Sequence, residues 1–372
     1  MKILQVYKDY PPVVGGIEYH VRMIAEEQAR RGHEVTVLVT SRRRDDEVAD
    51  INGVHVIKAG RLATVASAPL SLSLFRWMKQ LPADVAHLHF PYPIGELAYL
   101  AGGRARAMVI TYHSDIVRQK MLLRVYSPFL RRILQRADRI LPTNQQYIQS
   151  SPYLRPLADK CTVVPAGIRL ERFAEADPAQ VLAVRRQYGQ PLIVFVGRLV
   201  YYKGLEYLIR AMPQIPARLL VVGTGGMAKS WKALAARLEL TGKVIFLGEV
   251  PDEELPAYLY ASSVFVLPSS ARSEAFGASM LEGMACGLPA VSTELGTGTS
   301  FVNLDGETGL IVPPCDPAAL TAAINRLLSD SALRRSLGEA ARQRTWKLFS
   351  RETMVDNIMA VYDAVLQQKS SP

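Results

Sequence analysis

The sequence predicts an α/β protein built from two doubly wound parallel sheets, and two observations support this fold class. Short apolar runs recur along the 372 residues with helical periodicity between them, which is the pattern of strands joined by crossover helices. At about 150 residues per domain, the length allows two domains. Hydrophobic residues make up 49% and charged residues 21%, close to ordinary globular values, which excludes a disordered chain.

The first half begins with an apolar strand and a loop that ends in Gly15-Gly16. A helix follows over residues 18–31, and Gly32 lies where a C-terminal cap belongs. Strands are expected at residues 3–7, 34–40, 84–90 and 107–112.

The second half repeats this alternation after a polar stretch at 167–190, which suits a hinge. The tail from Trp346 onward is expected to form an amphipathic helix. Strands are expected at residues 192–196, 219–222, 243–247, 264–267 and 290–292, and helices at 230–240 and 279–285. Two such sheets predict ligand binding at the carboxyl ends of the strands.

The net charge of +10 is concentrated in the first half of the chain. Residues 1–178 carry 25 Lys and Arg against 17 Asp and Glu, whereas residues 179–372 carry 19 against 17. This asymmetry suggests a polyanionic partner: nucleic acid, an acidic membrane face or a phosphorylated ligand. No nucleic-acid-binding motif accompanies the charge, so a nucleic-acid partner is not expected.

Three cysteines, far apart and odd in number, argue against a disulfide framework or a zinc cage and favour reduced cytosolic thiols. No uncharged apolar run reaches the ~18 residues that a spanning helix needs. We therefore expect a cytoplasmic protein that can still touch the inner face of the cytoplasmic membrane.

Two loops contain residues suited to phosphate binding. Gly15-Gly16, between a strand and a helix, permit close backbone approach of an anion to the helix N-terminus, although a tight turn explains them equally. Arg198 and Lys203 follow a strand that ends at Gly197, and two cations there can clamp a diphosphate. Solvated loop charges are the alternative.

Two carboxylates and a histidine complete the candidate residues. Glu274 is expected just before a helix and Glu282 about two turns into it, where both can accept sugar hydroxyls. A hydrolase with paired carboxylates and two surface glutamates are the alternatives. His113 follows a strand, in a position suited to an active-site loop. His87 and His89 point the same way along a strand and suggest either a metal site without a third ligand or a structural pair.

Taken in order, these motifs resemble retaining glycosyltransferases of family 4, which have the GT-B fold. Segments 281–289 and 305–314 support the resemblance, which covers almost the whole chain. It implies two Rossmann-like domains facing each other across a cleft. The acceptor-side domain is expected at 1–175 and the nucleotide-sugar domain at 176–349, with a C-terminal helix at about 350–372 that packs back onto the first domain.

The resemblance also assigns roles to the motifs. Arg198 and Lys203 hold the donor diphosphate in place of a metal ion, so neither a metal nor another cofactor is expected. Glu282 binds the ribose hydroxyls, Glu274 binds the transferred sugar, and His113 lies near its anomeric carbon. The backbone amides expected to contact the sugar or phosphate are those of Phe276, Gly277 and Ala278. The glycines expected to let the first domain close over the diphosphate are Gly15 and Gly16.

The activity implied is a metal-independent, retaining hexosyl transfer. Segments 112–119 and 292–300 resemble subgroups that act in O-antigen and exopolysaccharide assembly, many of which use GDP-mannose or GDP-rhamnose. A GDP-hexose is therefore favoured over a UDP-sugar, and the expected acceptor is a lipid-linked or soluble glycan. The alternatives are a GT-B epimerase or phosphorylase and a non-catalytic protein that binds nucleotide sugar or anionic lipid.

A basic segment at 118–139 fits this picture. It interleaves seven Lys and Arg with apolar residues and contains a single acid, Asp138. Such an amphipathic helix suggests docking on anionic lipid, and a solvated helix whose apolar face packs in the core is the alternative. The residues expected to meet the membrane or acceptor are Arg118, Lys120, Arg124, Arg131 and Arg132.

Overall fold

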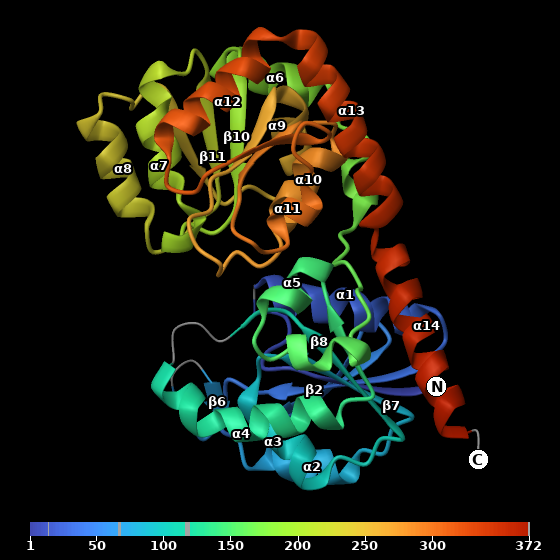
Figure 1. The fold of residues 1–372 in the computed structure, drawn as a ribbon. Helices are drawn as coiled ribbons and strands as arrows, with labels where there is room; N and C mark the ends of the chain where they lie inside the picture. The colour runs from blue at the N-terminus through green and yellow to red at the C-terminus, as the bar shows by residue number, and fades with distance from the viewer. Residues whose placement is uncertain (14, 66–67, 116–119, 371–372) are drawn as a thin grey trace. The chain divides into compact units, whose positions relative to one another are not determined.

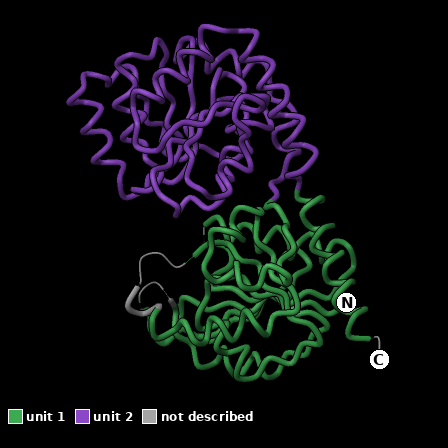
Figure 2. Tube along the Cα trace, viewed as in Figure 1, with its two compact units in different colours: residues 1–166, 351–372 green, residues 167–350 purple. Residues whose placement is uncertain are grey.

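A computed structural model describes residues 1–13, 15–65, 68–115 and 120–370. The chain forms two compact units, shown in Figure 2. The first unit comprises residues 1–166 and 351–372, and the second comprises residues 167–350. Residues 167–175, which we expected in the first domain, therefore lie in the second unit.

The first unit is built on a seven-stranded sheet with the order β3-β4-β2-β1-β7-β8-β9. Every neighbouring pair is parallel except β3 and β4, which are antiparallel. The strands are β1 (Lys2–Val6), β2 (Glu34–Thr40), β3 (Glu47–Ile51), β4 (Val54–Ala59), β7 (Val85–Phe90), β8 (Ala107–Tyr112) and β9 (Arg139–Pro142), and a separate hairpin joins β5 (Ala63–Val65) to β6 (Ala68–Leu70).

Helices flank this sheet and connect its parallel strands (Figure 1). The helix predicted at 18–31 is confirmed as α1, and Gly32 after it has φ +83°, a conformation that favours glycine. The helices of this unit are α1 (Gly16–Arg30), α2 (Ser73–Gln80), α3 (Pro93–Gly102), α4 (Lys120–Arg136), α5 (Gln145–Ser150), η1 (Arg155–Lys160) and α14 (Arg351–Ser370).

The second unit contains a six-stranded, fully parallel sheet with the order β12-β11-β10-β13-β14-β15. All five residues of β10 (Leu-Ile-Val-Phe-Val) are buried, as expected for a parallel strand covered on both faces. The strands are β10 (Leu192–Val196), β11 (Arg218–Val222), β12 (Val244–Gly248), β13 (Val264–Leu267), β14 (Ala290–Thr293) and β15 (Gly309–Val312).

The helices of the second unit lie on both sides of its sheet (Figure 1). The α-helices are α6 (Pro178–Tyr188), α7 (Leu205–Ala211), α8 (Ala228–Arg237), α9 (Leu255–Ala261), α10 (Ala278–Ala285), α11 (Thr299–Val302), α12 (Pro317–Ser329) and α13 (Ser331–Leu348). The 3₁₀ turns are η2 (Leu170–Phe173), η3 (Tyr201–Lys203) and η4 (Met212–Gln214). The stretch 167–190 therefore holds η2 and α6 rather than a plain polar hinge.

The C-terminal helix α14 belongs to the first unit, although the second unit precedes it in sequence. It packs against α1 and β8 and buries an apolar face that includes Val355, Ile358 and Val365. Arg31, the C-cap residue of α1, pairs with Asp356 at 2.6 Å and adds a polar contact at the rim. Among the residues that the structure describes, no helix is both long and apolar enough to cross a membrane.

Candidate active site

The loops that leave β10 and β11 lie against each other. Leu199 donates its amide hydrogen to Thr224 O at 2.8 Å, and Gly197 donates to Val222 O at 3.0 Å. Gly223 has φ +122°, and a Cβ there would lie 2.2 Å from Gly197 O. Glycine is therefore required for this close approach. β10 and β13 are neighbours in the sheet, but the strands that follow them in sequence, β11 and β14, lie on opposite sides of this pair. Such a reversal of strand order is called a topological switch point, and doubly wound folds bind ligands there.

Lys203 and Glu274, which the sequence placed in one site, do form a contact. Lys203 Nζ lies 2.6 Å from Glu274 Oε2, and both residues are more than nine-tenths buried. Ser269 Oγ also donates to Glu274 Oε2 at 3.1 Å. Gly204 lets these loops meet, because it has φ +62° and a Cβ there would lie 2.1 Å from Pro268 O.

Arg198 differs from Lys203 in its surroundings. Its side chain is exposed, and no ion pair to it is found among the described residues. The two cations thus emerge from one loop, but only Lys203 has a carboxylate partner in this structure. Arg198 is left to meet a ligand or solvent.

The segment between the two glutamates opens helix α10. The Phe276 side chain is buried edge-on against Phe349, with 6.0 Å between the ring centroids. The Gly277 amide, expected to face a ligand, donates to Glu274 Oε1 at 3.1 Å and so orients that carboxylate. Ala278 is exposed at the first position of the helix.

Glu282 is the fifth residue of α10, about one turn in rather than the two we expected. The pKa of its carboxyl group is raised to about 7, mainly by burial and in smaller part by the negative charge of Asp252. The positive charges of Arg172 and Lys203 partly offset this effect. Glu282 therefore shares an electrostatic environment with Lys203.

In the first unit, Gly15 is the N-cap of α1 and Gly16 its first residue. No side chain caps this helix end. A Cβ on Gly15 would lie 2.1 Å from Glu18 Oε2, because the Glu18 side chain folds back over the turn toward Lys8, 3.8 Å away. The glycine here leaves room for a carboxylate.

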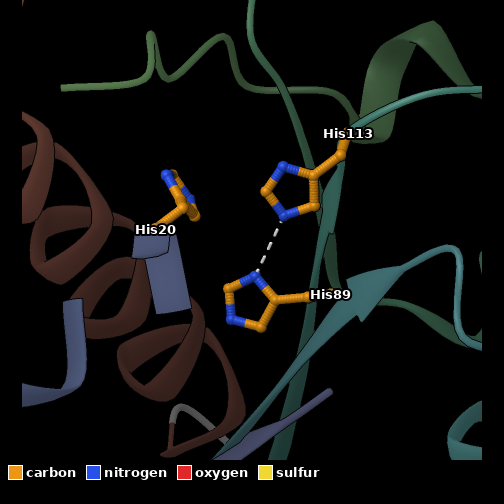
Figure 3. A group of neighbouring side chains, drawn as sticks. All are labelled: His20, His89 and His113. Atoms are coloured by element: carbon orange, nitrogen blue, oxygen red, sulfur yellow. Dashed lines mark hydrogen bonds between the residues drawn. The ribbon is translucent and has the colours of Figure 1, made fainter. Parts of the chain in front are cut away.

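Four histidines lie close together in this unit. The rings of His87 and His89 on β7 point the same way, as predicted, and stack with 4.4 Å between centroids. His113, after β8, stacks on His89 at 5.4 Å, and His20 of α1 meets His113 edge-on at 4.9 Å. Figure 3 shows His20 beside the His89–His113 pair. His20 was not predicted to join this group, because nothing in its sequence spacing links it to the other three histidines.

Burial keeps these rings neutral. It lowers the pKa of His20 to about 4 and that of His87 to about 3, and it lowers the pKa of His89 and His113 well below the usual value. His113 therefore enters any reaction near neutral pH as an uncharged imidazole. Its Nε2 lies 3.2 Å from His89 Nδ1, within hydrogen-bond distance.

Buried amide and hydroxyl groups hold the histidine rings. Gln5 Oε1 lies 2.8 Å from His89 Nε2, and Gln5 Nε2 donates to Gln28 Oε1 at 2.9 Å. Tyr362 OH, from α14, lies 2.6 Å from His87 Nδ1. These supporting residues carry no sequence motif, so only the structure reveals them.

The basic segment forms helix α4 from Lys120 to Arg136, whereas Arg118 lies outside the described residues. One face is buried and contributes to the core, and the opposite face is exposed and basic. Val125 and Phe129, one turn apart, are 74% and 47% exposed between the arginines. The buried residues are Leu130, Ile133 and Leu134, and the exposed arginines include Arg124, Arg131 and Arg132.

Comparisons with known proteins match this chain along its length. The profile of "Glycosyl transferases group 1" matches residues 183–344, and that of "Glycosyltransferase Family 4" matches residues 14–172. D-rhamnosyltransferase WbpZ of Pseudomonas aeruginosa is 37% identical over 100% of this chain and 98% of its own. O-antigen chain mannosyltransferase C of Escherichia coli is 34% identical over the full length of both chains.

Solved structures share the architecture. Sucrose-phosphate synthase from Thermosynechococcus elongatus superposes with a TM-score of 0.80 and 25% identity, over 99% of each chain. Anabaena HepE in complex with UDP superposes with a TM-score of 0.78 and 20% identity, over 98% of this chain and 100% of its own.

Proposed function

The chain belongs to the glycosyltransferases of group 1 and family 4 and has the GT-B fold, and from this membership we propose that it transfers mannose or rhamnose from a GDP-sugar in O-antigen synthesis. The full-length identity of 34–37% to a mannosyltransferase and a rhamnosyltransferase carries the proposal. A third relative, from Mycolicibacterium smegmatis, is named GDP-mannose-dependent and is 30% identical over 93% of this chain.

The charges of the second unit support a diphosphate-containing donor. Arg198 is exposed and Lys203 is buried beside Glu274, at the carboxyl end of the sheet. In the proposed reaction the bond from the anomeric carbon to the diphosphate breaks as the acceptor oxygen bonds to the same face of that carbon. The acceptor proton passes to the departing diphosphate, whose negative charge Arg198 and Lys203 stabilise without a metal ion. The role proposed for His113 near the anomeric carbon is that of a neutral imidazole.

A thermal-shift comparison of nucleotides tests the donor. GDP at 100 times its dissociation constant should stabilise the protein by about 2.7 kcal/mol, and UDP and ADP at the same concentration should stabilise it less. Glu282→Ala should abolish the GDP shift, whereas Glu339→Ala, at an exposed position on α13, should preserve it. A larger shift with UDP would overturn the choice of base.

An assay with donor and acceptor tests the proposed sugar transfer. GDP-mannose and GDP-rhamnose, each with a lipid-linked glycan acceptor, should give an acceptor extended by one sugar with retained anomeric configuration. Arg198→Ala should mainly lower kcat, because it removes charge stabilisation of the leaving group. Release of an isomerised donor without acceptor would instead indicate an epimerase.

We also propose that the exposed face of α4 docks on anionic lipid, where a lipid-linked acceptor would be found. Exposed Val125 and Phe129 offer apolar insertion between exposed arginines. Vesicles that contain phosphatidylglycerol should float the protein at low salt. Replacing Arg131 and Arg132 by Gln should weaken this binding by about 2 kcal/mol, at about 1 kcal/mol per basic residue. Equal flotation with neutral vesicles, or none with either, would exclude the electrostatic docking.

A further inference from the structure

Three histidine nitrogens in the first unit have the spacing of a metal site. One ring nitrogen each from His20, His89 and His113 lies within 4.8 Å of the others. His89 Nδ1 and His113 Nε2 are 3.2 Å apart. Two nitrogens that bind a tetrahedral ion at about 2.0–2.1 Å are about 3.3 Å apart, so these two already have the required separation.

His20 has a buried ring nitrogen that lacks a hydrogen-bond partner among the described residues. This nitrogen is Nε2, and the side chain that carries it is more than nine-tenths buried. A buried polar atom without a partner costs about 1–3 kcal/mol, so native proteins rarely keep one. Figure 3 shows the His20 ring beside the His89–His113 pair, and one of its nitrogens lies within 4.8 Å of a nitrogen of each, close enough for all three to share one ion.

The hydrogen bonds behind His89 turn its free nitrogen toward the group. Gln5 Nε2 donates to Gln28 Oε1 at 2.9 Å, so Gln5 Oε1 is left as an acceptor. His89 Nε2, 2.8 Å from Gln5 Oε1, must therefore carry the ring proton, and His89 Nδ1 holds the lone pair. A ring N–H held by an oxygen acceptor is how metal-binding histidines are usually oriented.

We propose that His20, His89 and His113 bind one Zn²⁺ ion through three neutral imidazole nitrogens. Imidazole suits zinc, and three protein ligands leave a fourth position for water. In the metal-free protein His113 Nε2 carries the proton that it donates to His89 Nδ1. On binding, that proton moves to His113 Nδ1, so coordination needs no net loss of a proton.

The site would make Zn²⁺ an inhibitor, and this part rests on the proposed function. An ion held by His113 Nε2 takes that nitrogen away from the transferred sugar. Zn²⁺ should therefore lower transfer while leaving nucleotide binding by the second unit unchanged. Binding of the ion is measured separately from activity. If the protein proved not to be a transferase, the proposed metal site would therefore be unaffected.

Cobalt replaces zinc as a visible probe in the test. The full-length protein, stripped of metal with a chelator, should take up one Co²⁺ per chain with the visible absorption of a tetrahedral site, and Zn²⁺ should displace it. His20→Gln should weaken uptake at least about tenfold, since even removal of a supporting residue has an effect of this size. The matched control is His55→Gln, at an exposed ring on β4 paired with Asp50, and it should bind as the wild type does.

Two results would overturn the proposal. One is a wild-type protein without a saturable equivalent of Co²⁺, and the other is a His20→Gln protein with unchanged affinity and spectrum. Circular dichroism establishes that each variant is folded. If His20→Gln does not fold, His113→Gln serves instead, because His113 is only partly buried and lies in a loop, and the same loss is expected.

Discussion

Lys203 and Glu274 bring opposite charges together at a buried position at the end of the second sheet. Glu274→Ala should lower the free energy of unfolding of the second unit by about 3–5 kcal/mol, because it leaves the Lys203 charge buried without its partner. Urea denaturation measures the loss. Glu339→Ala, an exposed change on α13, should stay within about 0.5 kcal/mol of wild type. Equal effects of Glu274→Ala and Glu339→Ala would show that the buried Lys203–Glu274 pair does not contribute to the free energy of unfolding.

Glu282 gives the second unit a measurable dependence on pH. Its carboxyl pKa is about 7 in the folded protein against the ordinary 4.5, so between these values the native state holds a proton that the unfolded chain releases. The free energy of unfolding contributed by this group therefore falls as pH rises from 4.5 to 7.

Comparison of wild type with Glu282→Gln isolates this contribution. The buried histidines, whose pKa is lowered, act in the opposite direction but are present in both proteins. The stability of the variant relative to wild type should rise steadily across the window. A difference that does not change with pH would contradict the raised pKa.

For single residues, the sequence motifs predicted the candidate site residues but not the residues that contact them in space. The motif residues lie near strand ends and helix starts, and the alternation of strands and helices in the sequence is enough to predict those positions. They are Arg198, Lys203, Glu274 and Glu282. His20, Gln5 and Tyr362 meet the other histidines only because α1, β1 and α14 pack together. Contacts between residues far apart in sequence depend on tertiary packing, which local spacing does not encode.

Among the secondary-structure elements, the strands were easier to predict than the helices. Strands such as β10 and β13 are uninterrupted apolar runs, because both faces of a parallel sheet are covered. Helix α6 was missed within the polar stretch 167–190. Only Val184 of this helix is buried, so it has almost no apolar periodicity to detect. Its start was nonetheless marked by Asp177, which caps the helix, and Pro178.

Helix α14 is anchored by a polar contact as well as by its apolar face. The hydroxyl of Tyr362 lies 2.6 Å from His87 Nδ1 and near the side-chain amides of Gln5 and Gln28. Tyr362→Phe should destabilise the first unit by about 1–3 kcal/mol, because it leaves buried partners unsatisfied. Tyr188→Phe, at a half-buried position in the second unit, is the control for loss of a hydroxyl. Guanidinium unfolding should show a smaller loss of stability for this control than for Tyr362→Phe. Wild-type stability of Tyr362→Phe would show that the network is dispensable.

At the scale of the whole molecule, the two units differ in how the chain builds them. Residues 167–350 form the second unit from one continuous segment, whereas the first unit needs both 1–166 and 351–372. A fragment comprising 167–350 should therefore fold alone and bind GDP within about tenfold of the full chain. A fragment comprising 1–166 should not fold cooperatively, because it lacks α14. Calorimetry of both fragments is the test, and an unfolded 167–350 fragment would contradict the assignment of an independent unit.

The division into two α/β sheets followed from length and alternation, but the exact boundary did not. The chain enters the second unit at 167 and leaves it at 350, where Ile168 pairs with Ser350 and donates its amide hydrogen to Phe349 O at 2.9 Å. This pairing joins residues about 180 positions apart. Composition shifts cannot reveal such a junction, which is why the predicted limit at 175/176 lies within the second unit.

The late position of α14 imposes an order on biosynthesis. When residue 166 has been made, 184 residues remain before the ribosome reaches Arg351, about 10–40 s at about 5–20 residues per second. Throughout that interval the nascent first unit has His87 without Tyr362 and an apolar surface on α1 without its cover. The second unit is meanwhile synthesised as an uninterrupted segment. The first unit, although its synthesis begins first, should therefore be the last to complete its fold. A chaperone that shields apolar surface should act mainly on this unit.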